Sequence, residues 1–135
     1  MKKILLSIKP RFVDEIRRGN KLYEYRKILP KKNCIRKLLI YESCPVKRVV
    51  AECDIESFIW MNTEKLWEKT ASLSGIDKCF YDQYFDNRPL AGAIKMRNIR
   101  FFDKVKTIDE YNIKVAPQSF CYIEDLAESE YPLND

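Results

Sequence analysis

The sequence predicts an α+β domain: a small mixed β-barrel of five to six strands, flanked by two to three short helices. Strand-like stretches gather towards both ends of the chain, whereas the middle has helical patterns. Strands and helices do not alternate regularly, which argues against an open parallel sheet built from βαβ units. The length of 135 residues fits one domain. We assign that domain to residues 1–125, followed by an acidic tail at 126–135.

The elements of the first half are defined by apolar runs and turn residues. Pro10 suits the first turn of a short helix, and Gly19 lies where a left-handed residue would end it. Pro45 fixes a turn ahead of a long, partly alternating strand. The expected elements are strands at 2–8, 21–29, 35–43 and 48–60, and a helix at 9–19.

In the second half, two helices precede the last strands. Asn62 or Thr63 can cap a helix that ends before Gly75. Aromatic residues at helical spacing follow, and we expect most of them to be core residues rather than base-stacking surfaces. The expected elements are helices at 64–73 and 76–85, a strand at 90–102, a helical turn at 108–111 and a last strand at 118–125.

The composition excludes several classes of protein. Hydrophobic residues make up 46% of the chain and charged residues 33%, so a packed core is expected and global disorder is not. No apolar run approaches the roughly 18–20 residues that span a membrane. The N-terminus lacks the apolar segment and the cleavage site of a signal peptide. We therefore expect a cytoplasmic protein without a membrane partner.

The chain contains five cysteines and no histidine. The cysteines are scattered, without a C-x-x-C pair, which argues against a disulfide framework and a zinc site. The acidic residues Glu52, Asp54 and Glu56 fit a solvated strand face better than a hard-metal site. Without histidine, any catalysis must use Lys, Tyr, Ser, Thr, Cys or a carboxylate. We expect no metal and no cofactor.

Positive charge is concentrated in the first part of the chain. Residues 1–50 carry 15 Lys and Arg against 4 Asp and Glu, whereas residues 51–135 carry 10 against 16. Such a basic half favours a polyanionic partner, because phosphate neutralisation supplies most nonspecific affinity for nucleic acids. The alternative is that these cations only solvate the surface.

Five stretches together resemble the ASCH domain family of the PUA-like superfamily. They are "LLSIKP" (5–10), "GNKLYEYRK" (19–27), "IYESCPVKRVVAE" (40–52), "LAGAIKMRNIRFFD" (90–103) and "APQSFCYI" (116–123), with G-x-K-x-x-E-x-R inside the second. The resemblance covers about residues 3–124. It implies a five- or six-stranded pseudo-barrel with a positively charged cleft for RNA or modified nucleobases. One fold hosts many functions, so the activity is not fixed by it.

The second stretch contains a departure from one family activity. In members that hydrolyse N4-acylated cytidine, a lysine follows G-x and a threonine three residues later is the nucleophile. Lys21 matches that lysine, but Glu24 stands at the threonine position. A carboxylate cannot make the same acyl transfer by the same route. This departure from the family pattern therefore disfavours the amidohydrolase activity.

The same stretch has two other interpretations. In one, Glu24 accepts a hydrogen bond from an exocyclic amine, and Arg26 binds a phosphate or base edge. Strand alternation would place Lys21 with Tyr23 and Tyr25 on one face, and Glu24 with Arg26 on the other. In the second interpretation, Glu24 pairs with Arg26 or Lys21 and only ties the strand in place.

A second family activity is ribonuclease, assigned to a tyrosine, a lysine six residues later and a distant serine. Tyr41 and Lys47 have that spacing, and Ser119 is the candidate serine. Lysine can stabilise the charge of a phosphorane, and tyrosine or lysine can move a proton. In the alternative without catalysis, Tyr41 packs at the rim of the barrel, Lys47 is a solvated residue of a turn and Ser119 caps a local turn.

The sequence favours an RNA- or nucleotide-binding domain with a basic cleft. A metal-independent ribonuclease is the main alternative, and a transcription-coregulator interaction module that uses the acidic tail is a further one. Whether the chain is an enzyme, which nucleic acid it prefers and its oligomeric state are left open. The expected lining is Lys9, Arg11, Lys21, Glu24, Arg26, Tyr41 and Lys47, together with Ser119.

Overall fold

The computed structural model describes residues 2–31 and 34–124, and these form two compact units. Unit 1 is made of the described residues within Met1–Pro10, Cys34–Asp54 and Asn98–Asp135. Unit 2 is made of those within Arg11–Asn33 and Ile55–Arg97. The tail at 126–135 lies outside the described residues.

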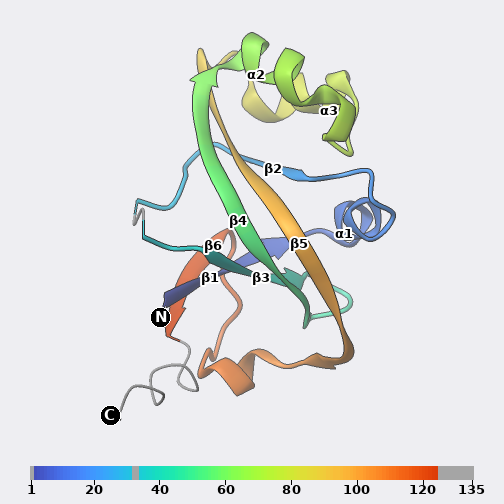
Figure 1. The fold of residues 1–135 in the computed structure, drawn as a ribbon, viewed down its shortest axis with the longest axis vertical. Coiled ribbons are helices and arrows are strands. Elements are labelled where there is room, and N and C mark those ends of the chain that lie inside the picture. The colour runs from blue at the N-terminus through green and yellow to red at the C-terminus, as the bar shows by residue number, and fades with distance from the viewer. Residues whose placement is uncertain (1, 32–33, 125–135) are drawn as a thin grey trace. The chain divides into compact units, whose positions relative to one another are not determined.

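The order of the elements along the chain follows the sequence prediction (Figure 1). The predicted helical turn at 108–111 is confirmed as a 3-10 helix, and a second one, η1, continues α2. The described elements are β1 (Lys2–Ile8), α1 (Pro10–Arg17), β2 (Tyr23–Arg26), β3 (Lys37–Glu42), β4 (Arg48–Asn62), α2 (Thr63–Thr70), η1 (Ala71–Leu73), α3 (Lys78–Phe85), β5 (Leu90–Lys106), η2 (Ile108–Tyr111) and β6 (Phe120–Glu124).

The six described strands form one mixed sheet in the order β2-β5-β4-β3-β1-β6. Strand β1 pairs in parallel with β3, whereas its pairing with β6 is antiparallel, as are those of β2 with β5 and β3 with β4. The predicted α+β class is confirmed. The sheet is not closed, however, because closure requires its two end strands to pair and the order ends at β2 and β6. The predicted barrel is therefore an open sheet.

Strand β1 is an interior strand of unit 1. Leu5 and Leu6 are completely buried in it, because β3 and β6 flank β1 on both sides and side chains cover both faces. Leu5 packs with Leu39 and Tyr41 of β3, and with Val49 and Ile123. The short apolar run of the N-terminus is therefore a buried interior strand.

An aromatic cluster forms the core of unit 2. The ring of Tyr25 on β2 meets Tyr81 and Phe85 of α3 edge to face, with centroid distances of 5.0 and 6.2 Å. Its hydroxyl lies 2.6 Å from Oγ1 of Thr70, which in turn donates to the carbonyl of Leu66 at 2.7 Å. The buried polar atoms of this core are thus paired within α2 and β2.

Local capping signals define the helix ends, and those at Asn62 and Gly19 are as predicted. The side chain of Asn62 accepts a hydrogen bond from Lys65 N and starts α2. Asp77 accepts from Phe80 N and starts α3. Gly19 follows α1 with φ +83°, in the left-handed region that glycine adopts most readily.

The helices of the described residues are all too short or too polar to cross a bilayer.

We expect unit 2 to become less stable above pH 10 because of Tyr25. Burial raises the pKa of Tyr25 from its ordinary value of 10 to about 12. Between these values the unfolded chain releases the proton first, so unfolding becomes easier as the pH rises. Urea titrations should show a loss of about 1–2 kcal/mol over this range. The loss should be smaller in Tyr25→Phe, and an equal loss in that variant would contradict the assignment.

Candidate functional site

The eight residues of the predicted lining divide equally between the two units. Lys9, Tyr41, Lys47 and Ser119 belong to unit 1, and Arg11, Lys21, Glu24 and Arg26 belong to unit 2. A single cleft that holds all eight side chains stays a prediction.

In unit 1, three hydroxyl-bearing residues lie in one row across neighbouring strands. Ser7 of β1 is the register partner of Tyr41 in β3. On the other side of β1, the backbone N–H of Ser7 donates to the carbonyl of Ser119 at 2.9 Å. Strands are spaced about 4.8 Å apart, so the Cα atoms of Tyr41 and Ser119 are about 10 Å apart. The sheet therefore brings together two residues that are far apart in the sequence.

Tyr41 is buried, yet its hydroxyl has no hydrogen-bond partner among the residues that the structure describes. Its ring packs in the unit 1 core, with 6% of the residue exposed. Buried tyrosine hydroxyls normally find a partner, because burial without one costs about 1–3 kcal/mol. Among the described residues, the hydroxyl of Tyr41 is thus an unpaired hydrogen-bonding group.

Two exposed lysines belong to the same unit. Lys47 lies in the turn that joins β3 to β4 and has φ 54°, a left-handed conformation that is uncommon for a residue other than glycine. Lys9 follows β1 directly, two positions beyond Ser7. Neither ammonium group has a carboxylate partner within residues 2–31 and 34–124. Both charges are therefore available to an anion.

Ser7 is the residue of this row that sequence reasoning missed. Its hydroxyl donates to the carbonyl of Pro117 at 2.7 Å and holds the segment that carries Ser119. The pattern of the β1 segment marks Ser7 only as an interruption of an apolar run. The one signal that could have found it is its shared register with Tyr41 and Ser119, which becomes visible only once the strands are paired.

In unit 2, three predicted residues form a buried charged cluster. Nη2 and Nε of Arg26 donate to Oε2 of Glu24 at 2.7 and 3.2 Å. Nζ of Lys21 lies 3.6 Å from Oε1 of the same carboxylate. Lys21, Glu24 and Arg26 are 2%, 6% and 9% exposed. The carboxylate of Glu24 thus pairs with two buried cations.

Lys21 is held by more than its ion pair. Its ammonium donates to the carbonyl of Ser74 at 2.7 Å, and residues 21 and 74 also form an isolated β-bridge. Burial lowers the pKa of Lys21, and the charge of Glu24 opposes this effect. Because β2 begins only at Tyr23, strand alternation does not extend to Lys21. Lys21 can therefore reach Glu24, which the face assignment from the sequence had separated from it.

The acidic residues of β4 are paired with lysines. Glu52 pairs with Lys3 at 2.9 Å, and Glu56 pairs with Lys95 at 3.1 Å. Hydrogen bonds from Asn98 and Lys37 lower the pKa of Asp54 to about 2. Within the described part of the chain, no group of three or more Cys, Asp or Glu side chains could hold a metal ion.

A pocket of about 440 Å³ opens in unit 2 where α2 starts and α3 ends, and none of the predicted site residues lines it. Lys78 lines it and pairs with Glu64 at 3.1 Å and Asp82 at 3.0 Å. The charges of this pocket largely satisfy one another.

Strand order, helix positions and register together define a PUA-like α+β fold. The sequence pattern of the ASCH domain family matches residues 6–100, which is well over half of the chain. The chain therefore belongs to the ASCH domain family.

Two curated relatives illustrate the range of proteins that carry such a sequence. The large ribosomal subunit protein uL22 of Ureaplasma parvum is 30% identical over 92 residues, which are 68% of this chain and 30% of that protein. An ASCH domain-containing ribonuclease of Zymomonas mobilis is 26% identical over 97 residues, which are 72% of this chain and 66% of the relative. The chain thus spans about 30% of the length of its ribosomal relative.

A solved structure agrees with the fold. The crystal structure of ASCH from Zymomonas mobilis superposes with a TM-score of 0.83 and 21% identity, and the superposition covers 94% of this chain and 91% of the other. Structures of that protein have also been solved with a tyrosine replaced by phenylalanine and with a serine replaced by alanine.

Proposed function

We propose that this chain binds single-stranded RNA at the row of Ser7, Tyr41 and Ser119 in unit 1. Lys9 and Lys47 supply the charge for the phosphates, and the hydroxyl of Tyr41 contacts the bound strand. The observation that carries the proposal is that Tyr41 is only 6% exposed and its hydroxyl has no hydrogen-bond partner among the described residues. A polar group in that state can complete its hydrogen bonding with a bound ligand.

The surrounding chemistry supports a phosphate-bearing ligand. Lys9 and Lys47 are exposed and have no carboxylate partner among the described residues. A left-handed backbone at a residue such as Lys47 is a feature of functional sites, where the local strain is held by the fold. RNA is favoured as the phosphate source because one relative is named a ribonuclease and another a ribosomal protein.

The binding proposal predicts a selective effect of Lys47. Wild-type protein should bind a labelled single-stranded oligonucleotide, with affinity that falls steeply with salt. Lys47→Gln should weaken binding about 3–10-fold and lower the slope of log affinity against log salt by about 0.7, as expected for one lost phosphate contact. Fluorescence anisotropy at several salt concentrations measures both quantities.

Lys114→Gln is the matched control, because Lys114 is another exposed lysine of unit 1 without a carboxylate partner among the described residues. It should change affinity by less than about 2-fold. Equal effects of the two substitutions would remove the special role of Lys47. No binding by wild-type protein at low salt would refute the proposed function itself.

The second candidate function is metal-independent RNA cleavage at the same row. It is favoured by the placement of Tyr41 and Ser119 on either side of Ser7, with Lys47 in the adjoining turn. In this reaction the 2′-hydroxyl attacks the neighbouring phosphorus and loses its proton. The 5′-oxygen leaves and gains one, so the products are a 2′,3′-cyclic phosphate and a 5′-hydroxyl end. Tyr41 would move a proton, and Lys47 would stabilise the phosphorane.

Cleavage is expected to continue when EDTA is present and to fall about 100-fold or more in Tyr41→Phe, with RNA affinity changed far less. Tyr122→Phe is the control, because Tyr122 lies on β6 at a position whose side chain points to the opposite face from Ser119. Quantifying cyclic-phosphate ends over time measures the rate. Binding without any product would reject the nuclease and leave the binding proposal standing.

A further inference from the structure

In unit 2, two cations lie over partly exposed aromatic rings. None of these residues belongs to the row of Ser7, Tyr41 and Ser119 in unit 1. The rings of Phe12 on α1 and Phe80 on α3 meet edge to face, with centroids 5.2 Å apart. The ring of Tyr84, one turn further along α3, lies nearly parallel to that of Phe80, at 6.4 Å and an interplanar angle of 10°. All three residues are partly exposed, whereas their neighbours Tyr81 and Phe85 are buried.

Arg11 lies over two of these rings. Its Cζ atom is 4.7 Å from the centroid of Phe12 and 5.0 Å from that of Phe80. The residue is exposed, and its guanidinium makes no hydrogen bond or ion pair with any residue that the structure describes. By contrast, Arg17 on the same helix pairs with Asp14 at 3.1 Å. Arg11 is therefore oriented by aromatic faces rather than by an acidic residue.

Lys27 repeats this arrangement on the third ring. Its Nζ lies 4.9 Å from the centroid of Tyr84 and has no carboxylate partner in the described part of the chain. Asp77, at the start of α3, uses its side chain to cap Phe80 N. The positive charges of Arg11 and Lys27 are thus not neutralised by ion pairs.

A cation held on a ring is well prepared to bind an anion. Stacking fixes the plane of the guanidinium and leaves the N–H groups at its edge free to donate to two phosphate oxygens. Part of the conformational entropy of the side chain is already lost before binding. Partly exposed rings beside such cations can also stack on bases, which contributes about 1–3 kcal/mol per base.

We propose that Arg11, Phe12, Lys27, Phe80 and Tyr84 form a second contact surface for single-stranded RNA, here called the cation–aromatic surface. Arg11 binds one phosphate through its guanidinium edge, Lys27 binds another, and Phe80 and Tyr84 contact the bases between them. The choice of RNA rests on the proposed function. Unpaired charge on aromatic faces fits a polyanion with stacking bases better than an apolar protein partner.

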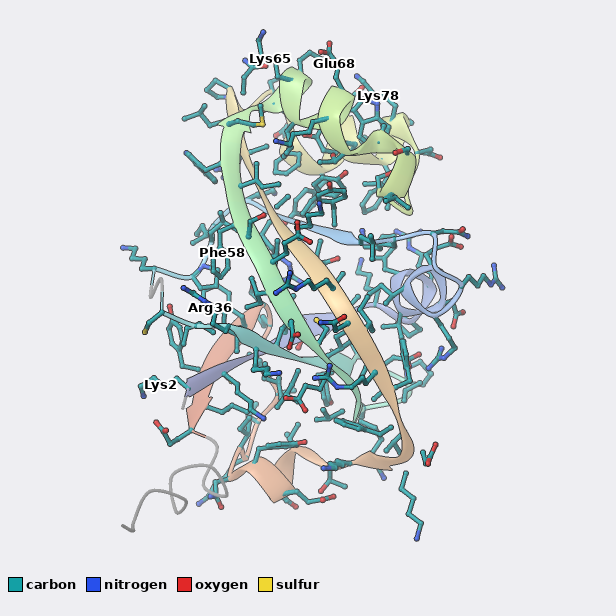
Figure 2. All side chains as sticks on the ribbon, viewed as in Figure 1. Lys2, Arg36, Phe58, Lys65, Glu68 and Lys78 are labelled. Carbon is teal, nitrogen blue, oxygen red and sulfur yellow. The ribbon has the colours of Figure 1, made fainter. Side chains whose placement is uncertain are left out.

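The test compares cations that differ in their surroundings but not in charge. Arg11→Gln should weaken binding of a labelled oligouridylate about 3–10-fold, and Lys27→Gln should do the same. Each should lower the salt slope by about 0.7. The controls are Arg17→Gln on α1 and Lys65→Gln on α2, where Figure 2 shows the Lys65 side chain pointing away from the helix. Each control should change affinity by less than about 2-fold.

Arg11→Lys separates charge from geometry, because it keeps the cation and removes the planar fork. We expect it to restore the salt slope and only part of the affinity. If the wild type binds RNA and the affinity losses of Arg11→Gln and Arg17→Gln are equal, the cation–aromatic surface is refuted. The proposed function is left intact by that result. Absence of wild-type binding at low salt would overturn both.

Discussion

Replacing Glu24 by glutamine is expected to lower the free energy of unfolding by about 3–5 kcal/mol. The carboxylate of Glu24 serves Arg26 at 2.7 Å and Lys21 at 3.6 Å, and all three residues are at most 9% exposed. Glutamine has nearly the same shape but no charge, so it leaves two buried cations without their shared anion. Breaking such a cluster costs far more than the net stabilisation of an intact ion pair.

Urea unfolding followed by circular dichroism measures this effect. Glu56→Gln is the matched control, because Glu56 pairs with Lys95 at 3.1 Å on the surface of the same unit. That exposed pair should contribute less than about 1 kcal/mol. Similar losses in the two variants would show that the cluster of Lys21, Glu24 and Arg26 is solvated in solution and does not tie β2 in place.

The deficit of Glu24→Gln should also shrink as the pH rises. Burial already lowers the pKa of Lys21, and removal of Glu24 takes away the main charge that opposes this effect. A lysine with a lowered pKa binds fewer protons in the folded protein than in the unfolded chain. The stability of the variant therefore rises with pH relative to wild type. A deficit that stays constant between neutral pH and pH 10 would contradict this account of Lys21.

The sequence predicted the ion pairs of this cluster better than its burial. Charge and spacing correctly suggested that Glu24 pairs with Arg26 or Lys21, as one of two interpretations. The burial of Lys21 could not be foreseen from the sequence, because it depends on Ser74. Ser74 is 53 residues away and is not part of the local sequence pattern around Lys21. The role of these residues in ligand recognition stays a prediction.

Secondary structure was predictable where the signal is local. Capping by Asn62, the left-handed Gly19 and the apolar run of β1 each specify an element within a few residues. Strand ends were less accurate, since a strand ends where its hydrogen-bonded pairing stops, and this depends on residues far away in the sequence. β2 covers only Tyr23–Arg26 against the expected 21–29, whereas β5 continues to Lys106, beyond the expected 102.

The candidate row of unit 1 illustrates the limit of sequence reasoning about sites. Tyr41 and Ser119 were proposed through the family resemblance, and nothing local relates them. They become neighbours of one strand only because β1 pairs in parallel with β3 and antiparallel with β6. Ser7, through which both are aligned, has no sequence signal of its own. Its position is a product of the strand order.

Replacing Gly75 by alanine is expected to destabilise the protein by about 2–5 kcal/mol, through the same lysine. Gly75 has φ +69°, a conformation that costs alanine roughly 1–2 kcal/mol. An added Cβ would also lie 2.6 Å from Cβ and 2.9 Å from Cγ of Lys21. The lysine stem cannot move aside easily, because its ammonium is bound to the carbonyl of Ser74. Thermal and urea unfolding measure the loss.

Gly19→Ala is the control that isolates the contact with Lys21. Gly19 has a similar φ of +83°, but an added Cβ would meet no heavy atom within 4 Å. Its substitution should therefore show the backbone cost alone, about 1–2 kcal/mol. The excess loss in Gly75→Ala reports how firmly the loop after η1 is packed against the stem of Lys21. Equal losses at the two glycines would mean that this loop gives way, and that the carbonyl of Ser74 does not hold the lysine beside Glu24.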